Sequence, residues 1–373
     1  MRMMKPRERF LAALRGQPVD RVPLDLPGFQ FESEAALEAL EDPRRHDVAR
    51  RHFPESIFFV RVPNQINRTL VTPPGRISRQ REELADGTIR QIKTIDTPSG
   101  PLVGISQYSR VSEQWGTIKE VVESYEDIEK IRSIPFELDE AVRIPAPDER
   151  PPDFAERGIL STRISSPFAC VAGMMNYEWF LELALTEPDL IADLTEICRR
   201  RTLKVLDVLL AEPGIEYVWL GGSEWVTPPM ASPAIYDALV QEQERSLIDS
   251  IHSRGDILVH IHCHGNVRHA LGRTIERGAD YTEPVEPPPD GDITMAEAKQ
   301  LAAGRIALGG NVEARILCNG SADEVEGAVR AAFDGGKHRF VLRPTESPSP
   351  RMTDREGANY LRLLDLWDEL SPT

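Results

Sequence analysis

The sequence predicts a single (β/α)8 barrel, and three observations support this fold class. From about residue 158 onward, apolar strand-like segments alternate with amphipathic helical segments, which is typical of parallel strands joined by helical crossovers. Two earlier strands bring the expected number of strands to eight, which closes a barrel. Polar residues follow every predicted strand, whereas an open doubly wound sheet, the competing architecture, needs them only beside its switch point.

The N-terminal part supplies a helical segment and the first two strands. Pro6–Leu14 carries Phe10, Leu11 and Leu14 at helical spacing, and Gly16 follows as a stop. After this helix we expect a first strand at Val19–Leu26, a helix at Glu34–Leu40 and a second strand at Ser56–Arg61.

Residues 72–122 have a different pattern. Short alternating runs such as Gly87–Ile95 and Ser106–Val111 are bounded by Asp-Gly and Pro-Ser-Gly turns, which indicates antiparallel hairpins. We therefore expect a β-hairpin insertion here, followed by a helix at Tyr125–Ile134. We expect the insertion to belong to one domain that spans residues 1–373.

The remaining elements alternate regularly. Strands are predicted at Gly158–Arg163, Glu216–Gly222, Asp256–His264, Ala279–Thr282, Arg305–Gly309 and Arg339–Leu342. Helices are predicted at Trp179–Leu185, Asp189–Leu210, Pro233–Ser253, Val267–Arg277, Met295–Ala302, Ala322–Phe333 and Asp354–Leu370.

Composition excludes several classes of partner. The formal net charge of -16 argues against nucleic acid and against anionic membranes, both of which need a basic surface. No apolar run is long enough to span a membrane, and the four cysteines are scattered without CxxC pairing, so we expect a cytoplasmic protein. A small-molecule substrate is the expected partner, and a homodimer is left open.

The richest ligand chemistry lies in Leu258–Asn266, where an apolar strand leads into His260, His262, Cys263 and His264. Side chains alternate along a strand, so the three histidines share one face and Cys263 takes the other. Two imidazoles two residues apart on one face can share a metal ion. The alternative interpretation is a strand end with hydrogen-bonded core histidines.

A catalytic zinc takes three protein ligands and leaves one position open. His262 and His264 can supply two of them, and Cys263 would replace a histidine only if the backbone kinks. The acidic candidates for the third ligand are, in order of preference, Glu346, Glu224 and Glu283. Each acidic residue taken alone also fits a helix cap, a salt-bridge partner or a solvated loop charge. The other polar residues at strand ends are Asp25, Arg61, Arg163, Glu286, Asn311 and Glu313.

Several short segments resemble the uroporphyrinogen decarboxylase superfamily. They are Arg7–Gly16 leading to Asp20–Pro23, Thr97–Gly100, Tyr125–Ile128, Ser232-Pro233 and Leu308–Asn311. The resemblance covers nearly the whole chain and implies a (β/α)8 barrel. The heme-pathway decarboxylase of this superfamily binds its substrate's carboxylates through an Arg-Gln-Ala-Gly-Arg segment after the first strand. Here Leu26–Phe31 has no arginine in that place.

A second branch, the methylcobamide-to-thiol methyltransferases, is similar in the positions of its zinc ligands. That branch uses a His-x-Cys-Gly and a late Cys. Alignment on Gly265 places His262 and His264 on the first two ligands and brings the late Cys near Thr345 and Glu346. The resemblance thus implies a divalent metal held by His262, His264 and Glu346. Zinc is expected, with iron, manganese or cobalt admitted, because imidazole and carboxylate ligands select less sharply than thiolates.

The resemblance implies a metal-dependent methyltransferase that moves a methyl group between a corrinoid or methoxylated donor and a thiol. Glu224, Glu283 or Asn311 would orient the substrate or move a proton. No corrinoid-binding segment is recognisable in the sequence, so we expect a corrinoid, if one is used, to be carried by a separate protein. The alternatives are a decarboxylase of the uroporphyrinogen type and a non-catalytic barrel that binds a corrinoid or tetrapyrrole.

Overall fold

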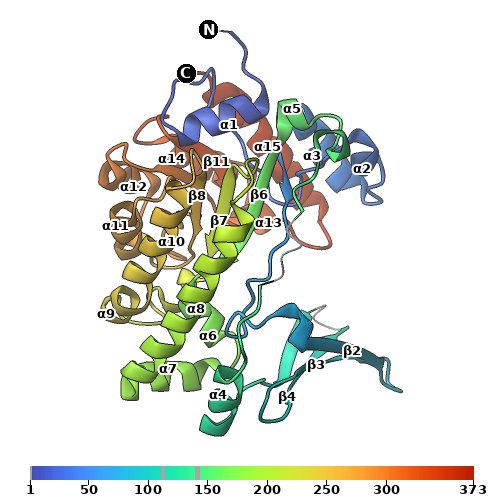
Figure 1. Cartoon of the computed structure of the whole chain (residues 1–373). Coiled ribbons are helices and arrows are strands. Elements are labelled where there is room, and N and C mark those ends of the chain that lie inside the picture. The colour runs from blue at the N-terminus through green and yellow to red at the C-terminus, as the bar shows by residue number, and fades with distance from the viewer. Residues whose placement is uncertain (1, 111–113, 139–142) are drawn as a thin grey trace.

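The computed structural model describes residues 2–110, 114–138 and 143–373, and its centre is a curled, parallel, seven-stranded sheet (Figure 1). The strands pair in the order β1-β6-β7-β8-β9-β10-β11. Their bounds are β1 Phe58–Arg61, β6 Gly158–Ser165, β7 Tyr217–Gly221, β8 Leu258–His262, β9 Tyr281–Glu283, β10 Ala307–Val312 and β11 Phe340–Pro344. The structure therefore confirms an α/β fold with a parallel sheet, and it does not confirm a closed barrel of eight strands.

The predicted first strand, Val19–Leu26, is much shorter than expected. Leu24 makes a single parallel bridge to Leu342 on β11, with hydrogen bonds that flank it. Among the described residues no pairing joins this segment to β1. The physical reason is that Pro23 and Pro27 have no N–H to donate, and they interrupt the ladder on both sides of Leu24.

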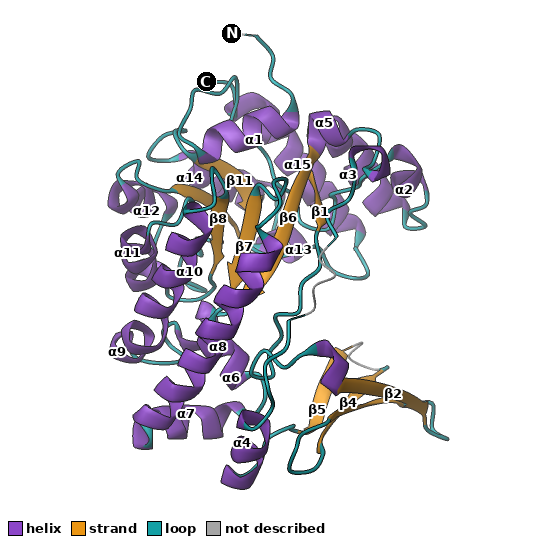
Figure 2. Ribbon diagram, viewed as in Figure 1, coloured by secondary structure: helices purple, strands orange, loops and turns teal. Residues whose placement is uncertain are grey.

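Helices surround the outer face of the curl, as Figure 2 shows for α8, α10, α11, α12 and α14. The helices are α1 Pro6–Leu14, α2 Glu34–Glu38, α3 Pro43–His52, α4 Tyr125–Arg132, α5 Phe154–Arg157, α6 Pro167–Ala172, α7 Tyr177–Thr186, α8 Pro188–Leu209, α9 Pro233–Tyr236, α10 Glu242–His252, α11 Val267–Arg277, α12 Met295–Ala302, α13 Ala314–Asn319, α14 Ala322–Phe333 and α15 Asp354–Leu370. No helix of the described residues is long and apolar enough to cross a membrane.

Most predicted helices are confirmed, with two kinds of difference. The helix expected at Pro233–Ser253 is α9 and α10 joined by a π-helical stretch, Asp237–Gln241. The short helices α3, α5, α6 and α13 were not predicted, because segments of four to ten residues hold too little periodicity to separate them from loops.

The insertion forms a separate antiparallel sheet in the order β2-β3-β4-β5, which confirms the predicted hairpins. Its strands are β2 Ile77–Glu83, β3 Ile89–Ile95, β4 Leu102–Ser109 and β5 Gln114–Lys119. Residues 111–113 of the predicted insertion, with the end of the run Ser106–Val111, lie outside the described residues. In Figure 2 this sheet stands apart from the parallel sheet, on the side away from α1.

The inside of the curl is apolar at the end where the strands begin. Phe10, Leu11 and Leu14 of α1 pack there against the first inward residues of the strands. Those residues are Ile159, Tyr217, Leu258, Tyr281, Ala307 and Val341, together with Ile57, which directly precedes β1. Helix α1 therefore closes this end of the curled sheet, and we call this apolar cluster the plug. The opposite end, where the strands finish, stays open and carries polar side chains.

Candidate metal centre

A cavity of about 230 Å³ opens inside the curl where the parallel strands end. Side chains from six of the seven strands reach it, because alternate residues of each strand point inward. Its polar lining consists of Asp25, Gln30, Arg61, Ser161, Arg163, Tyr217, Trp219, His260, His262, His264, Glu283, Arg343, Thr345, Glu346 and Ser347. The carboxyl ends of barrel strands are where such folds place their reactive groups.

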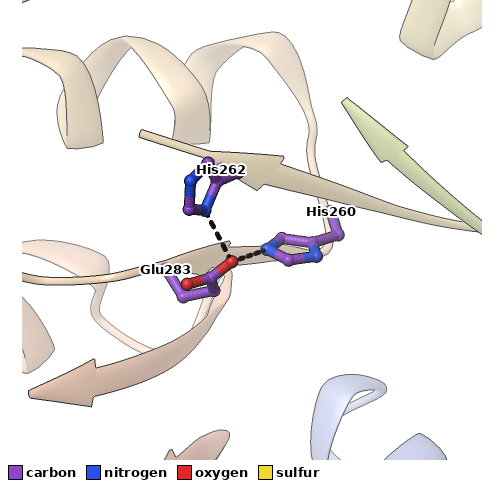
Figure 3. Close-up of side chains that lie close together, drawn as sticks. All are labelled: His260, His262 and Glu283. Carbon is purple, nitrogen blue, oxygen red and sulfur yellow. Dashed lines mark hydrogen bonds and ion pairs between the residues drawn. The ribbon is translucent and has the colours of Figure 1, made fainter. Parts of the chain in front are cut away.

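Three of these side chains form a tight group, His260 and His262 of β8 and Glu283 of β9 (Figure 3). His262 Nδ1 lies 2.8 Å from Glu283 Oε1, and His260 Nε2 lies 2.9 Å from the same oxygen. The register explains the meeting, since His262 pairs directly with Glu283 on the neighbouring strand. One atom from each side chain lies within 4.8 Å of the others. Two nitrogens and one oxygen can bind a divalent cation at this spacing.

The cluster is buried and its charges are strongly coupled. Burial lowers the pKa of His260 to about 4, so this imidazole is neutral at neutral pH. Burial raises the pKa of Glu283, but the charge of Arg343 and the contacts with both histidines outweigh it. The pKa of this carboxyl therefore lies well below its ordinary value. A neutral imidazole beside an ionised carboxylate is the protonation state that metal ligation requires.

Two atoms of the cluster, His260 Nε2 and Glu283 Oε2, form no hydrogen bond among the described residues, and Oε2 has the charge of Arg343 beside it. Within the described part of the chain, His260 Nε2 is fully buried and its 2.9 Å approach to Glu283 lacks hydrogen-bond geometry. The other ring nitrogen, Nδ1, lies 2.6 Å from the Tyr217 hydroxyl, which holds the ring in place. One nitrogen of the His260 ring is held by Tyr217, and the other forms no hydrogen bond and can bind a cation. The residues present therefore fit a metal ion.

Arg343 of β11 anchors the carboxylate of Glu283 from the opposite side. Its guanidinium lies 3.1 Å from Glu283 Oε2 and 2.8 Å from Asp25 Oδ2, and it is nearly buried between them. Gly309 of β10 leaves the space that this packing needs, since a Cβ there would lie 2.0 Å from the Tyr281 hydroxyl. Glu283 is therefore fixed by its neighbours.

The predicted ligands His264 and Glu346 lie at the outer rim of the same cavity. His264 Nε2 is 3.6 Å from Glu346 Oε1, and the Glu346 side chain is 62% exposed. The rings of His262 and His264 are 4.6 Å apart. Glu286 lies 2.9 Å from His264 Nδ1. Burial lowers the pKa of His264, but Glu286 and the other nearby carboxylates outweigh it, and the net shift is upward.

Cys263 points away from the histidines, as the alternation predicts. Its Sγ is buried 3.2 Å from Thr227 Oγ1, and burial raises the pKa of the thiol to about 12. A neutral thiol on the far face of the strand is not a metal ligand in this arrangement.

The structure does not bring Glu224 and Asn311 into the cavity lining among the described residues. Glu224 accepts a hydrogen bond of 2.8 Å from the Gly222 N–H and borders a neighbouring apolar groove with Trp225 and His264. Asn311 is buried on β10, paired in register with Arg343. Sequence reasoning missed Tyr217, Trp219 and the anchoring role of Arg343. The period-two pattern of Glu216–Gly222 was the available signal for the two aromatic residues.

Comparison with known proteins gives a family and a fold. The family model for uroporphyrinogen decarboxylase (URO-D) matches residues 117–347. Comparison with curated proteins finds no match. Among solved structures, a methyltransferase from Methanosarcina mazei is 16% identical, with a TM-score of 0.58 over 98% of this chain and 99% of that chain. That likeness concerns the fold.

A B12-independent methionine synthase from Shewanella sp. W3-18-1, in complex with selenomethionine, is a weaker match. It is 11% identical with a TM-score of 0.37, over 79% of this chain and 74% of that chain, and so little similarity says nothing about function. The family match spans more than half of the sequence and includes three of the segments noted above, Tyr125–Ile128, Ser232-Pro233 and Leu308–Asn311. The chain belongs to the uroporphyrinogen decarboxylase (URO-D) family.

Proposed function

We propose that this protein is a metal-dependent methyltransferase whose divalent cation is held by His260, His262 and Glu283. The observation that carries the proposal is the buried Nε2 of His260, which lies 2.9 Å from the ionised carboxylate of Glu283 but forms no hydrogen bond among the described residues. A buried polar atom without a hydrogen bond costs stability, so its retention in a cavity supports a ligand at this place. The ligand set expected from the sequence, His262, His264 and Glu346, remains the alternative metal site, at the rim of the cavity.

A bound cation, with zinc as the expected metal, would hold a thiol acceptor as its thiolate and leave the sulfur nucleophilic toward a methyl donor. Neighbouring residues of the protein hold the proposed ligands in position. Tyr217 orients His260, while Arg343 holds Glu283. The Trp219 ring lies 5.1 Å from the His262 ring and forms a wall of the cavity. His264 with Glu286 can hold a proton at the rim.

The methyl donor is proposed to be a methylated corrinoid on a separate protein, or a methoxylated compound. The URO-D family and the shared fold with a methyltransferase support this choice. So does the absence of an arginine from Leu26–Phe31, where the porphyrinogen decarboxylase binds its substrate. The cavity of about 230 Å³ is also smaller than the roughly 300–1,000 Å³ of typical pockets for drug-sized ligands, which favours a small acceptor.

A second candidate function is the decarboxylation of a small carboxylic acid. The observation that favours it is the presence of Arg61 and Arg163 in the cavity lining, where they can bind a carboxylate. This reaction predicts release of carbon dioxide that persists after the metal is removed.

The test is metal analysis of the purified chain beside three variants, followed by methyl transfer from free methylcobalamin to a thiol. We expect about one equivalent of metal per chain in the wild type, retention in His264→Ala, and loss in His260→Ala and Glu283→Gln. If His264→Ala loses the metal and His260→Ala retains it, the metal ligands are His262, His264 and Glu346 at the rim. If no preparation contains metal, or if the metal-loaded protein demethylates no methylcobalamin, the proposal fails.

A further inference from the structure

Two arginines stand together at the mouth of the cavity. Arg61 is the last residue of β1, and Arg163 lies on β6 two residues beyond Ser161, the register partner of Arg61. Residues two apart on a strand share a face, so both arginines point to the inside of the curl. Both line the cavity and both are exposed to solvent.

Neither arginine forms an ion pair with a carboxylate of the described residues. The chain carries 60 acidic and 44 basic residues, so unpaired guanidinium groups inside a cavity are not a result of scarce carboxylates. Arg343, in the same cavity, provides the contrast, since it is neutralised by Asp25 and Glu283. The positive charge of Arg61 and Arg163 is therefore available to a molecule that enters the cavity.

Arg163 is also oriented by an aromatic ring. Its guanidinium carbon lies 4.7 Å from the centre of the Trp219 ring, and Trp219 in turn lies 5.1 Å from the His262 ring. A guanidinium that stacks on an indole keeps its N–H edge free for a planar oxyanion. The Trp219 side chain thus contacts both Arg163 and the proposed metal ligand His262.

The electrostatics of the pair agree with this geometry. The partial burial of the Arg163 side chain at the cavity mouth lowers its pKa, and the charges of Arg61 and Arg343 lower it further. The cations therefore repel one another, and an anion placed between Arg61 and Arg163 relieves the repulsion.

We propose that Arg61 and Arg163 bind the anionic group, a carboxylate or a similar oxyanion, of a small substrate whose reacting end lies at the His260–His262–Glu283 cluster. The inference rests on the proposed function for the identity of the reacting end, and it adds the substrate class. The cavity volume of about 230 Å³ makes this substrate a short molecule.

The experiment is calorimetric titration of the full-length chain with propionate, inorganic sulfate and inorganic phosphate, and with 1-propanol as the uncharged counterpart of propionate. Each titration is run before and after removal of metal with a chelator. The variants are Arg61→Met and Arg163→Met. The matched control is Arg81→Met, which removes an exposed arginine on β2, a strand of the separate antiparallel sheet that does not line the cavity. Thermal unfolding of each variant verifies that it is folded.

We expect at least one anion to bind the wild type and 1-propanol not to bind. Each cavity substitution should weaken anion binding about 10-fold to 100-fold, and Arg81→Met should leave it unchanged. The three anions identify which oxyanion is preferred. Binding should survive chelation, so a failure of the metal proposal is seen separately. The inference is overturned if no anion binds the wild type, or if folded Arg61→Met and Arg163→Met bind as tightly as the wild type.

Discussion

The two ends of the curled sheet are built from the same strands and have opposite character. At the end where the strands begin, the inward residues are apolar or aromatic and pack on α1. At the end where they finish, the inward residues of the same strands are Arg61, Arg163, His260, His262 and Glu283. Leu258 and His262 are only four positions apart in sequence, yet Leu258 belongs to the plug and His262 to the cavity.

The apolar packing that stabilises the fold and the polar side chains that could bind a ligand therefore lie at opposite ends of the same strands. Burial of apolar side chains around α1 stabilises the sheet, and the opposite end can then carry buried charges that contribute little stability. Substitutions at the plug should therefore change the free energy of unfolding, and substitutions at the cavity should change binding.

Phe10→Ala should have the largest effect on stability. Phe10 is 1% exposed and contacts Phe59, Tyr217 and Tyr281, so its truncation leaves a cavity within the plug. The expected loss is about 3–5 kcal/mol in the free energy of unfolding, measured by urea denaturation. Metal content at low denaturant should stay at the wild-type level. Lost metal with unchanged stability would contradict the separation of the two ends.

Gly309→Ala should disturb both ends. The added Cβ would lie 2.0 Å from the Tyr281 hydroxyl of the plug and 2.9 Å from the Cβ of Glu283 in the metal centre. We expect a destabilisation of about 1–3 kcal/mol from overpacking, together with weaker metal binding because Glu283 moves. Urea denaturation and metal analysis on one preparation measure the two effects. If Gly309→Ala has the free energy of unfolding and the metal content of the wild type, β10 can move away from β9 at little cost, and this prediction is wrong.

Tyr217→Phe should weaken metal binding while it preserves the packing of the plug. The Tyr217 ring contacts Phe10, Phe59 and His260, and phenylalanine keeps these ring contacts. The substitution removes only the hydroxyl, which lies 2.6 Å from His260 Nδ1. Loss of a hydrogen bond that orients a ligating imidazole typically costs about 10-fold to 100-fold in metal affinity. Competition with a chelator measures the change. Unchanged affinity would indicate that His260 is not a ligand.

His252→Gln should have the smallest effect, confined to stability. His252 ends α10, and its Nε2 lies 2.9 Å from Asp280, just before β9 at the plug end. The hydrogen bond to Asp280 raises the pKa of His252 in the folded state. The pair therefore stabilises the fold fully below the ordinary pKa of about 6.5, and the contribution is lost as the pH rises through the folded-state value.

Because His252 is partly exposed, its contribution should stay below about 1 kcal/mol. Urea denaturation at mildly acidic and mildly alkaline pH should show the wild type more stable than the variant only on the acidic side. A difference that grows toward alkaline pH would contradict this assignment.

The sequence was sufficient for most of the fold and for the location of the candidate site. Alternation in Leu258–His264 placed three histidines on one face, and all three line the cavity. The sequence could not tell how deep each histidine lies. β8 ends at His262, so His264 already belongs to the rim and His260 reaches the inner cluster.

Contacts between distant segments were the information that the sequence lacked. The meeting of Glu283 with His262 depends on the register of β8 with β9, and the role of Arg343 depends on how the sheet curls. The predicted strand Val19–Leu26 was wrong in length for a local reason, because two prolines interrupt its backbone pairing. The predicted ligand set of His262, His264 and Glu346 remains a prediction for metal analysis to decide.

Glu283 is the only carboxylate in direct contact with Arg343, His260 and His262 among the described residues. A dication that joins this group adds more positive charge than the single carboxylate can offset. A negatively charged solute near Arg61 and Arg163 would then be held more firmly once the cation is present. By thermodynamic reciprocity the cation would be held more firmly by the same factor once the solute has arrived.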